Sequence, residues 1–158
     1  IYKRFVALYG ADGTRKKFPL PVEVLNSPVD LLRTAGVSNQ KASYLIDLAR
    51  RFEDRTITPR LFPAMTDEEI SKHLIQVKGI GQWTADMFLI FALNRPDVLP
   101  VGDLAIQKAF QRVFNLRRLP SQKRMQQLAA TWNGHRSVAC LYLWKSIDGE
   151  DSVIAKEK

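Results

Sequence analysis

Seven residues, VKGIGQW from Val77 to Trp83, combine the residue types that suit the binding of a phosphate group. Two glycines, Gly79 and Gly81, flank one isoleucine, and an apolar run begins directly after them. Glycine permits positive φ and a close approach to the backbone, and the first amides of a following helix carry partial positive charge. The stretch therefore predicts an anion cradle with Lys78 at its edge. A plain turn between two helices, in which glycine is also common, is the alternative that these residues leave open.

Asp103, in the segment LPVGDLAI, is the second residue that could do chemistry. Its local context predicts a helix N-cap, because an aspartate that follows a loop with proline and glycine and precedes an apolar helical pattern commonly accepts a hydrogen bond from the first helical turn. A catalytic role for its carboxylate is compatible with that cap.

The elements that must position these residues are predicted to be helices throughout. No stretch alternates as a β-strand does. The fold class is therefore predicted as all-α, a helical bundle of about seven helices. The expected helices cover residues 1–9, 28–35, 38–52, 66–76, 83–94, 103–115, 121–132 and 137–147, with loops at 10–26, 58–63 and 96–100 and a charged tail at 149–158. Capping residues are predicted at Ser27, Ser38, Thr66, Asp103 and Ser121, and Ser137 is predicted to open the last helix. The helix that begins at Trp83 is apolar nearly all round, which predicts burial at the centre of the domain.

Composition and charge exclude several classes of protein. The formal net charge is +8, from 24 Lys plus Arg against 16 Asp plus Glu, which favours a polyanionic partner such as nucleic acid. A single cysteine, Cys140, cannot form an internal disulfide or a four-cysteine metal site. The longest apolar run, residues 87–93, is far shorter than the roughly 20 residues that cross a bilayer, so no membrane association is expected.

Residues 74–106, LIQVKGIGQWTADMFLIFALNRPDVLPVGDLAI, resemble the helix-hairpin-helix DNA glycosylases, and among them the 3-methyladenine DNA glycosylase II family. The resemblance is specific because the hairpin, the tryptophan after it and an aspartate about twenty residues further on occur in order. It runs from Ile1 to about Ile147. It implies a glycosylase domain over residues 1–148, with its hairpin at about 68–95.

The resemblance also implies a role for each site residue. Asp103 is the expected catalytic residue, and Lys78 and the amides near Gly79, Gly81 and Trp83 are expected to bind a DNA phosphate. The main-chain carbonyls of Ile75, Val77 and Ile80 would hold a monovalent cation, Na⁺ or K⁺, and no cofactor is required for the chemistry. Bifunctional members carry a lysine at the position of Trp83, so a monofunctional hydrolysis of the N-glycosidic bond is expected.

The expected partner is double-stranded DNA with alkylated bases such as 3-methyladenine, bound by a monomer. The expected location is the bacterial cytoplasm, at the nucleoid, or the nucleus if the source is eukaryotic. Trp83, Met87 and His135 are expected to line the pocket for the flipped base. Some relatives have tyrosine at the position of Met87, and the family usually has another aromatic residue at that of His135.

Family members have an upstream helix with a Gln-Gln-Leu-Ser-like motif, and nothing precedes Ile1 here. The chain is therefore expected to be a piece of a longer protein or to need a companion chain. The alternative function is a non-catalytic helix-hairpin-helix module that binds damaged or abasic DNA.

Overall fold

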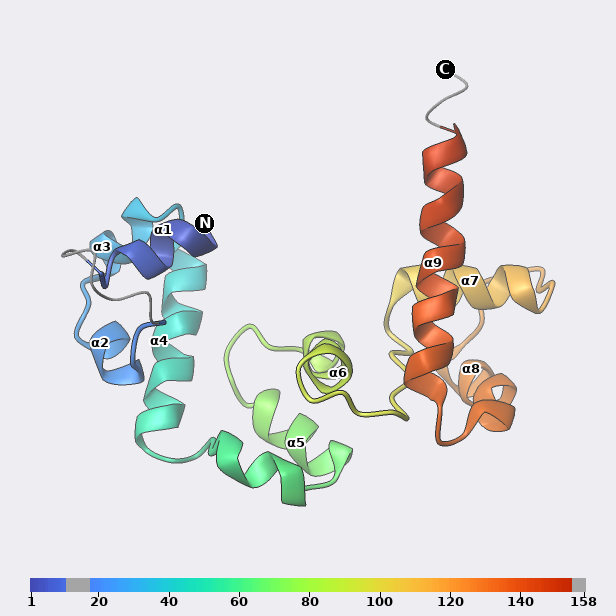
Figure 1. Cartoon of the computed structure of the whole chain (residues 1–158), viewed down its shortest axis with the longest axis horizontal. Coiled ribbons are helices and arrows are strands. Elements are labelled where there is room, and N and C mark those ends of the chain that lie inside the picture. Colours follow the sequence, from blue (N-terminus) through green and yellow to red (C-terminus); the bar gives the residue numbers. More distant parts are fainter. Residues whose placement is uncertain (11–17, 155–158) are drawn as a thin grey trace. The chain divides into compact units, whose positions relative to one another are not determined.

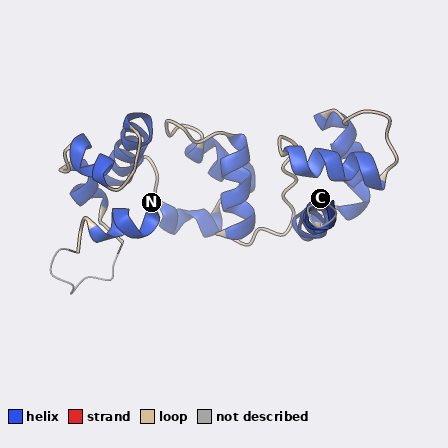
Figure 2. Ribbon diagram, turned by 90° about the horizontal axis from the view of Figure 1, so that it is seen from above, coloured by secondary structure: helices blue, strands red, loops and turns tan. Residues whose placement is uncertain are grey.

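The computed structural model describes residues 1–10 and 18–154, with side chains described as far as residue 147. Every regular element in these ranges is helical (Figure 2), which confirms the predicted all-α class. These ranges contain nine α-helices and two short 3₁₀ helices, rather than about seven helices. The chain divides into two compact units, Ile1–Ile80 and Gly81–Lys158.

The first unit is built around one long helix. Its elements are α1 (Tyr2–Ala7), α2 (Pro21–Leu25), α3 (Val29–Thr34), α4 (Asn39–Glu53), the 3₁₀ helix η1 (Pro59–Ala64) and α5 (Asp67–Leu74). Helices α2 and α3 pack against α4, and α1 lies near the start of α4 (Figure 1). Apolar side chains of these helices and of the loop between α3 and α4 form one buried cluster: Phe5, Val24, Leu32, Ala35, Val37, Ala42 and Ala49. Two alanines on α4 allow the short helices to approach its backbone closely.

Two predicted caps in the first unit are confirmed. Ser38 Oγ accepts a hydrogen bond from the Lys41 amide at 3.2 Å, and this bond starts α4. Thr66 and Glu69 form a reciprocal capping box, with the Glu69 amide donating to Thr66 Oγ1 at 3.2 Å and the Thr66 amide donating to Glu69 Oε2 at 2.8 Å. The polar side chains thus satisfy amides that have no partner inside the helix.

Several predicted boundaries in the first unit are wrong. The predicted loop 10–26 contains α2, whose first residue is a proline that suits the first helical position; the part of that loop at 11–17 lies outside the described residues. Pro28, not Ser27, is the N-cap residue of α3. The predicted loop 58–63 is the 3₁₀ helix η1, and α5 ends at Leu74 instead of Gln76.

The second unit contains α6 (Gln82–Phe91), α7 (Leu104–Val113), α8 (Gln122–Leu128), the 3₁₀ helix η2 (Ala129–Trp132) and α9 (Arg136–Ile154). Helices α7 and α9 pack against each other. Together with α8 and η2 they form a buried core that consists of Ile106, Ala109, Phe110, Met125, Ala129, Cys140 and Leu143. The Trp132 ring packs edge-to-face on the Phe110 ring, with 5.3 Å between the ring centroids, and this contact joins η2 to α7.

Two predictions for the second unit need correction. Helix α9 continues to Ile154, beyond the predicted end at Ile147 and into the segment predicted as a tail. Helix α6 is not buried all round, because Trp83 is 51% exposed and Phe91 is 59% exposed. Its opposite face, with Ala85, Leu89 and Ile90, is buried. Within residues 1–10 and 18–154, no helix combines the length and the apolar character needed to span a membrane.

Candidate active site

Asp103 is the N-cap residue of α7, as predicted. Its Oδ1 atom accepts a hydrogen bond from the Ile106 amide at 2.8 Å, and its backbone is extended. The loop before it makes a tight turn, in which the Asp103 amide donates to the Pro100 carbonyl at 2.9 Å. The side chain is buried, with 8% of the residue exposed. A carboxylate is therefore held at a helix N-terminus, where the helix dipole favours negative charge.

Two tryptophans donate to the same carboxylate. Trp83 Nε1 lies 2.6 Å from Asp103 Oδ2, and Trp144 Nε1 lies 3.2 Å from Asp103 Oδ1. An indole N–H can only donate and an ionised carboxylate can only accept, so each bond restricts the rotation of the side chain. Together with the cap, three N–H groups from α6, α7 and α9 fix the orientation of Asp103.

Trp144 is a site residue that the sequence analysis missed. Its ring packs on Phe91 of α6, with 5.7 Å between ring centroids and an interplanar angle of 32°. This contact sets the plane of the indole and so directs Nε1 towards Asp103. The signal in the sequence is weak, since an aromatic residue in the last helix ordinarily predicts a core position.

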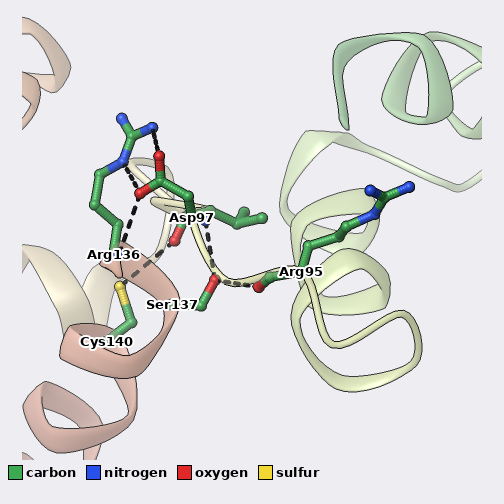
Figure 3. A network of polar contacts seen from close by, with 6 residues as sticks. Arg95, Asp97, Arg136, Ser137 and Cys140 are labelled. Carbon is green, nitrogen blue, oxygen red and sulfur yellow. Dashed lines mark hydrogen bonds and ion pairs between the residues drawn. The ribbon is translucent and has the colours of Figure 1, made fainter. Parts of the chain in front are cut away.

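A bidentate ion pair fastens the loop between α6 and α7 to the start of α9 (Figure 3). Arg136 Nε lies 2.6 Å from Asp97 Oδ1, and Arg136 Nη2 lies 2.6 Å from Asp97 Oδ2. The Arg136 amide also donates to Asp97 Oδ1 at 3.2 Å. Chiefly through the side-chain hydrogen bonds, Arg136 lowers the pKa of Asp97 to about 2. The pair is thus fully formed at neutral pH.

Ser137 makes further hydrogen bonds to the same loop, beside the ion pair in Figure 3. Its hydroxyl donates to the Arg95 carbonyl at 2.6 Å and accepts from the Val98 amide at 2.9 Å. Helix α9 begins one residue earlier than predicted, at Arg136, so Ser137 lies inside the helix and binds the loop. Helix α9 therefore binds the loop that leads to Asp103 in two ways: through the Asp97 side chain and through the loop backbone on either side of it.

Cys140 lies one turn further along α9 and is fully buried. Burial raises the pKa of its thiol to about 12. Because the thiolate is the reactive form, Cys140 is unsuited to nucleophilic catalysis and serves the core. The nearest polar contact is a weak one from Sγ to the Val98 carbonyl at 4.0 Å.

Of the three residues predicted for the base pocket, Trp83 contacts Asp103, whereas Met87 and His135 make no hydrogen bond to it among the described residues. Trp83 lies at Asp103 with its ring half exposed. Met87 is half-buried one turn along α6, and His135 is exposed just before α9, where its amide donates to the Trp132 carbonyl at 2.8 Å. The pocket-lining roles remain predictions.

The part of the hairpin turn that belongs to the first unit is a tight loop at residues 77–80. The Ile80 amide donates to the Val77 carbonyl at 3.1 Å, and Gly79 has φ of +82°. This φ is the left-handed conformation that glycine adopts without strain. The Lys78 amide donates to Asp47 Oδ2 of α4 at 2.9 Å, so this amide faces α4, whereas the Lys78 side chain is exposed.

The part of the turn that belongs to the second unit starts α6. Gly81 is its N-cap residue and has no side chain that could cap the helix. A Cβ atom built on Gly81 would meet no atom within 4 Å. The amides of the first turn of α6 therefore begin at an open surface, which is the arrangement that anion binding at a helix N-terminus requires.

The helical fold, the glycine turn and the buried aspartate agree with the class of protein that the sequence resembles, and comparison with known proteins gives the family. The family model described as "HhH-GPD superfamily base excision DNA repair protein" matches residues 1–134. The chain belongs to this superfamily.

Similar proteins and structures cover most of the chain. It is 31% identical to DNA-3-methyladenine glycosylase 1 of Schizosaccharomyces pombe over 147 residues. This matched region is 92% of the chain and 63% of that protein. It is 36% identical to the YfjP protein of Bacillus subtilis, of which it covers 51%. The crystal structure of a DNA-3-methyladenine glycosidase from Bacillus halodurans matches 92% of the chain and 65% of its own length, with a TM-score of 0.82 and 31% identity. The chain thus spans only half to two thirds of these proteins.

Proposed function

We propose that the chain is the catalytic part of a monofunctional DNA glycosylase, which hydrolyses the N-glycosidic bond of alkylated purines such as 3-methyladenine and leaves an abasic site. The observation that carries the proposal is the Asp103 carboxylate, buried and oriented by three N–H donors beside a half-exposed indole. A buried carboxylate with this degree of orientation suits the stabilisation of a positive charge that develops during a reaction.

The two oxygens of Asp103 differ in how they are engaged. Among the described residues, Oδ1 accepts from the Ile106 amide and the Trp144 indole, whereas Oδ2 accepts from the Trp83 indole alone. We assign Oδ2 to the reacting sugar, because it keeps more of its acceptor capacity and its one donor belongs to an exposed side chain. The atom that does the chemistry is then separate from the atom that anchors the residue.

The reaction follows from this geometry. The bond between C1′ and the purine nitrogen breaks, its electron pair leaves with the alkylated base, and the sugar develops oxocarbenium character. The Asp103 carboxylate stabilises that charge. A water oxygen then bonds to C1′, and the proton that the water loses is accepted by Asp103. A cationic alkylated purine leaves as a neutral base, so no general acid is needed for its departure.

Trp83 supports hydrolysis without strand cleavage. An indole cannot attack C1′ to form a Schiff base, which is the step that a lysine provides in bifunctional enzymes. Its half-exposed ring offers an aromatic face that attracts a cationic base. The base would enter beside Trp83 after it is flipped out of the duplex.

The hairpin turn would hold the DNA backbone. Phosphate binding is assigned to Lys78 and the amides near Gly79, Gly81 and Trp83, and a Na⁺ or K⁺ ion to the carbonyls of Ile75, Val77 and Ile80. The Val77 carbonyl already accepts from the Ile80 amide, but a carbonyl oxygen has a second lone pair for a cation. These contacts are to backbone and position DNA without reading its sequence. The net charge of +8 supports such a partner.

Solved structures support the substrate class. A solved structure of the 3-methyladenine DNA glycosylase of Schizosaccharomyces pombe is a complex with abasic DNA, and it matches 91% of the chain with a TM-score of 0.72 and 26% identity. Abasic DNA is the product that the proposed reaction leaves.

The proposal is tested by measuring the bases released from alkylated duplex DNA, with this chain and with a version extended at its N-terminus. Free 3-methyladenine should appear, and the abasic strand should stay intact until it is treated with alkali. Tight binding of abasic DNA without any base release by either form would favour the non-catalytic module. Strand cleavage that can be trapped by borohydride would contradict the monofunctional assignment.

A further inference from the structure

Helix α4 directs three side chains at the hairpin turn. Tyr44, Asp47 and Arg51 are spaced three and four residues apart, which places them on one face of the helix. The Tyr44 ring lies directly against Gly79, so that a Cβ atom at Gly79 would overlap it. The turn at residues 77–80 therefore rests on α4 through an aromatic ring.

Asp47 makes the polar contact between this face and the turn. Its Oδ2 atom accepts from the Lys78 amide at 2.9 Å and from Arg51 Nε at 3.1 Å. The side chain is 12% exposed, and the hydrogen bond from the Lys78 amide is the main cause that lowers its pKa. Arg51 Nη1 also lies 3.5 Å from Gln76 Oε1, which ties the residue before the turn to the same face.

These contacts fix which side of the turn is open. The Lys78 amide is occupied by α4, and the φ of +82° at Gly79 reverses the chain directly after it. A carboxylate at this place opposes phosphate binding by simple Coulomb repulsion, although Arg51 offsets part of its charge. The change in DNA affinity when the Asp47 carboxylate is removed therefore shows whether the conformation of the turn or the charge beside it is decisive.

We propose that Asp47 is a positioning residue for the DNA-binding turn: its carboxylate holds the Lys78 amide against α4 and thereby sets the conformation in which the turn binds a phosphate. The inference rests on the proposed function, because it assumes that the turn binds DNA. Charge alone predicts that DNA binds more tightly when the negative Asp47 is removed. The positioning role predicts the opposite, that DNA binds more weakly.

The test measures the affinity of the full chain for a fluorescent duplex with one abasic site, together with the melting temperature of each variant. Asp47→Ala should weaken binding on the order of tenfold, because a charge-assisted anchor of the turn is lost. Asp47→Asn keeps an oxygen that can accept from the Lys78 amide, and should recover most of this loss. Asp30→Ala is the matched control, since it removes the same charge from an exposed pair with Arg33 on α3.

The Lys78 amide gives a readout that does not involve DNA. Its hydrogen exchange should become faster in Asp47→Ala and stay slow in Asp47→Asn and Asp30→Ala. Equal affinities for Asp47→Ala and Asp30→Ala would overturn the inference while leaving the proposed function intact, as would equal losses in Asp47→Ala and Asp47→Asn. A wild-type chain that binds no DNA would overturn the proposed function itself, and the inference with it.

Discussion

The loop that ends at Asp103 and the hairpin turn at residues 77–80 are each held by a neighbouring helix, but in different ways. Helix α9 binds the loop with an ion pair, a serine hydroxyl and an indole N–H, so that its side chains engage both the backbone and Asp103 itself. Helix α4 binds the turn with one carboxylate, which accepts from the Lys78 amide, and with one aromatic ring, which packs on Gly79.

Under the proposed function, the difference corresponds to what each region must present. A carboxylate that stabilises charge in a transition state must keep one orientation, and rotation of its side chain would cost activity. A turn that binds a phosphate presents main-chain groups, whose directions follow once the backbone is fixed. Few contacts on the side of α4 are then sufficient, and the remaining side stays open to a ligand. Substitutions in the two regions should therefore affect different steps.

The largest effect is expected at Asp103. Asp103→Asn removes the charge. Its remaining oxygen can still accept from the Ile106 amide and the Trp144 indole, but its NH2 group cannot accept from the Trp83 indole, so the free energy of unfolding should fall by about 1 to 2 kcal/mol. Base release should drop on the order of a hundredfold or more, because the preorganised charge is lost. Single-turnover release of 3-methyladenine measures this change. Affinity for abasic DNA should survive, and equal release rates for the two proteins would leave Asp103 with the helix cap alone.

The next effect separates the two glycines of the turn. Gly79→Ala places a side chain in the left-handed region and against the Tyr44 ring, and should lower the free energy of unfolding by about 2 kcal/mol. Gly81 has φ of −97° and open space around its Cβ position, so Gly81→Val should change stability far less. Because a branched side chain there obstructs a phosphate, it should still weaken DNA binding.

Thermal unfolding and DNA titration of both variants measure these outcomes. A large loss of stability in Gly81→Val, with unchanged affinity per folded molecule, would favour the plain-turn interpretation of the second glycine.

The sequence predicts the parts of this structure that depend on local rules. The caps at Ser38, Thr66 and Asp103 are confirmed because each depends on a hydrogen bond to an amide only three residues away. The sequence does not predict α2, because Pro19 and Pro21 indicate a loop, although Pro21 occupies the first helical position. The burial predicted for α6 failed at Trp83 and Phe91, since an apolar sequence does not state which face lies outward.

The candidate site shows the same limit. Asp103 and Trp83 could be named through a resemblance in sequence, and the hydrogen bond between them is consistent with a shared site. Trp144, Arg136 and Asp47 could not, because their partners lie 41, 39 and 31 residues away. Pairings at that separation are decided by tertiary packing, which a single sequence does not display.

Acid should weaken the attachment of the loop to α9. The pKa of Asp97 is lowered to about 2, so the pair with Arg136 stabilises the fold above pH of about 4 and is lost as pH falls towards 2. With allowance for its partial exposure, its contribution is about 1 to 2 kcal/mol. Urea unfolding between pH 6 and pH 2 measures the effect, and Asp97→Asn is the comparison. The difference between wild type and variant should shrink as pH falls; a difference that is constant with pH would contradict the role of the pair.

The smallest expected effect concerns Trp144. Trp144→Phe keeps a ring against Phe91 but removes the N–H donor to Asp103 Oδ1, which the Ile106 amide still binds. Base release should fall about fivefold, the usual net value of one hydrogen bond, and the loss should appear in kcat rather than KM because only the orientation of the carboxylate changes. Trp132→Phe is the matched control: its ring packs on Phe110 and Phe114 in the same unit, so it should lower the melting temperature without changing release per folded molecule. If both variants lose activity only in proportion to their unfolded fraction, Trp144 is a core residue and Asp103 is oriented sufficiently by its cap and Trp83.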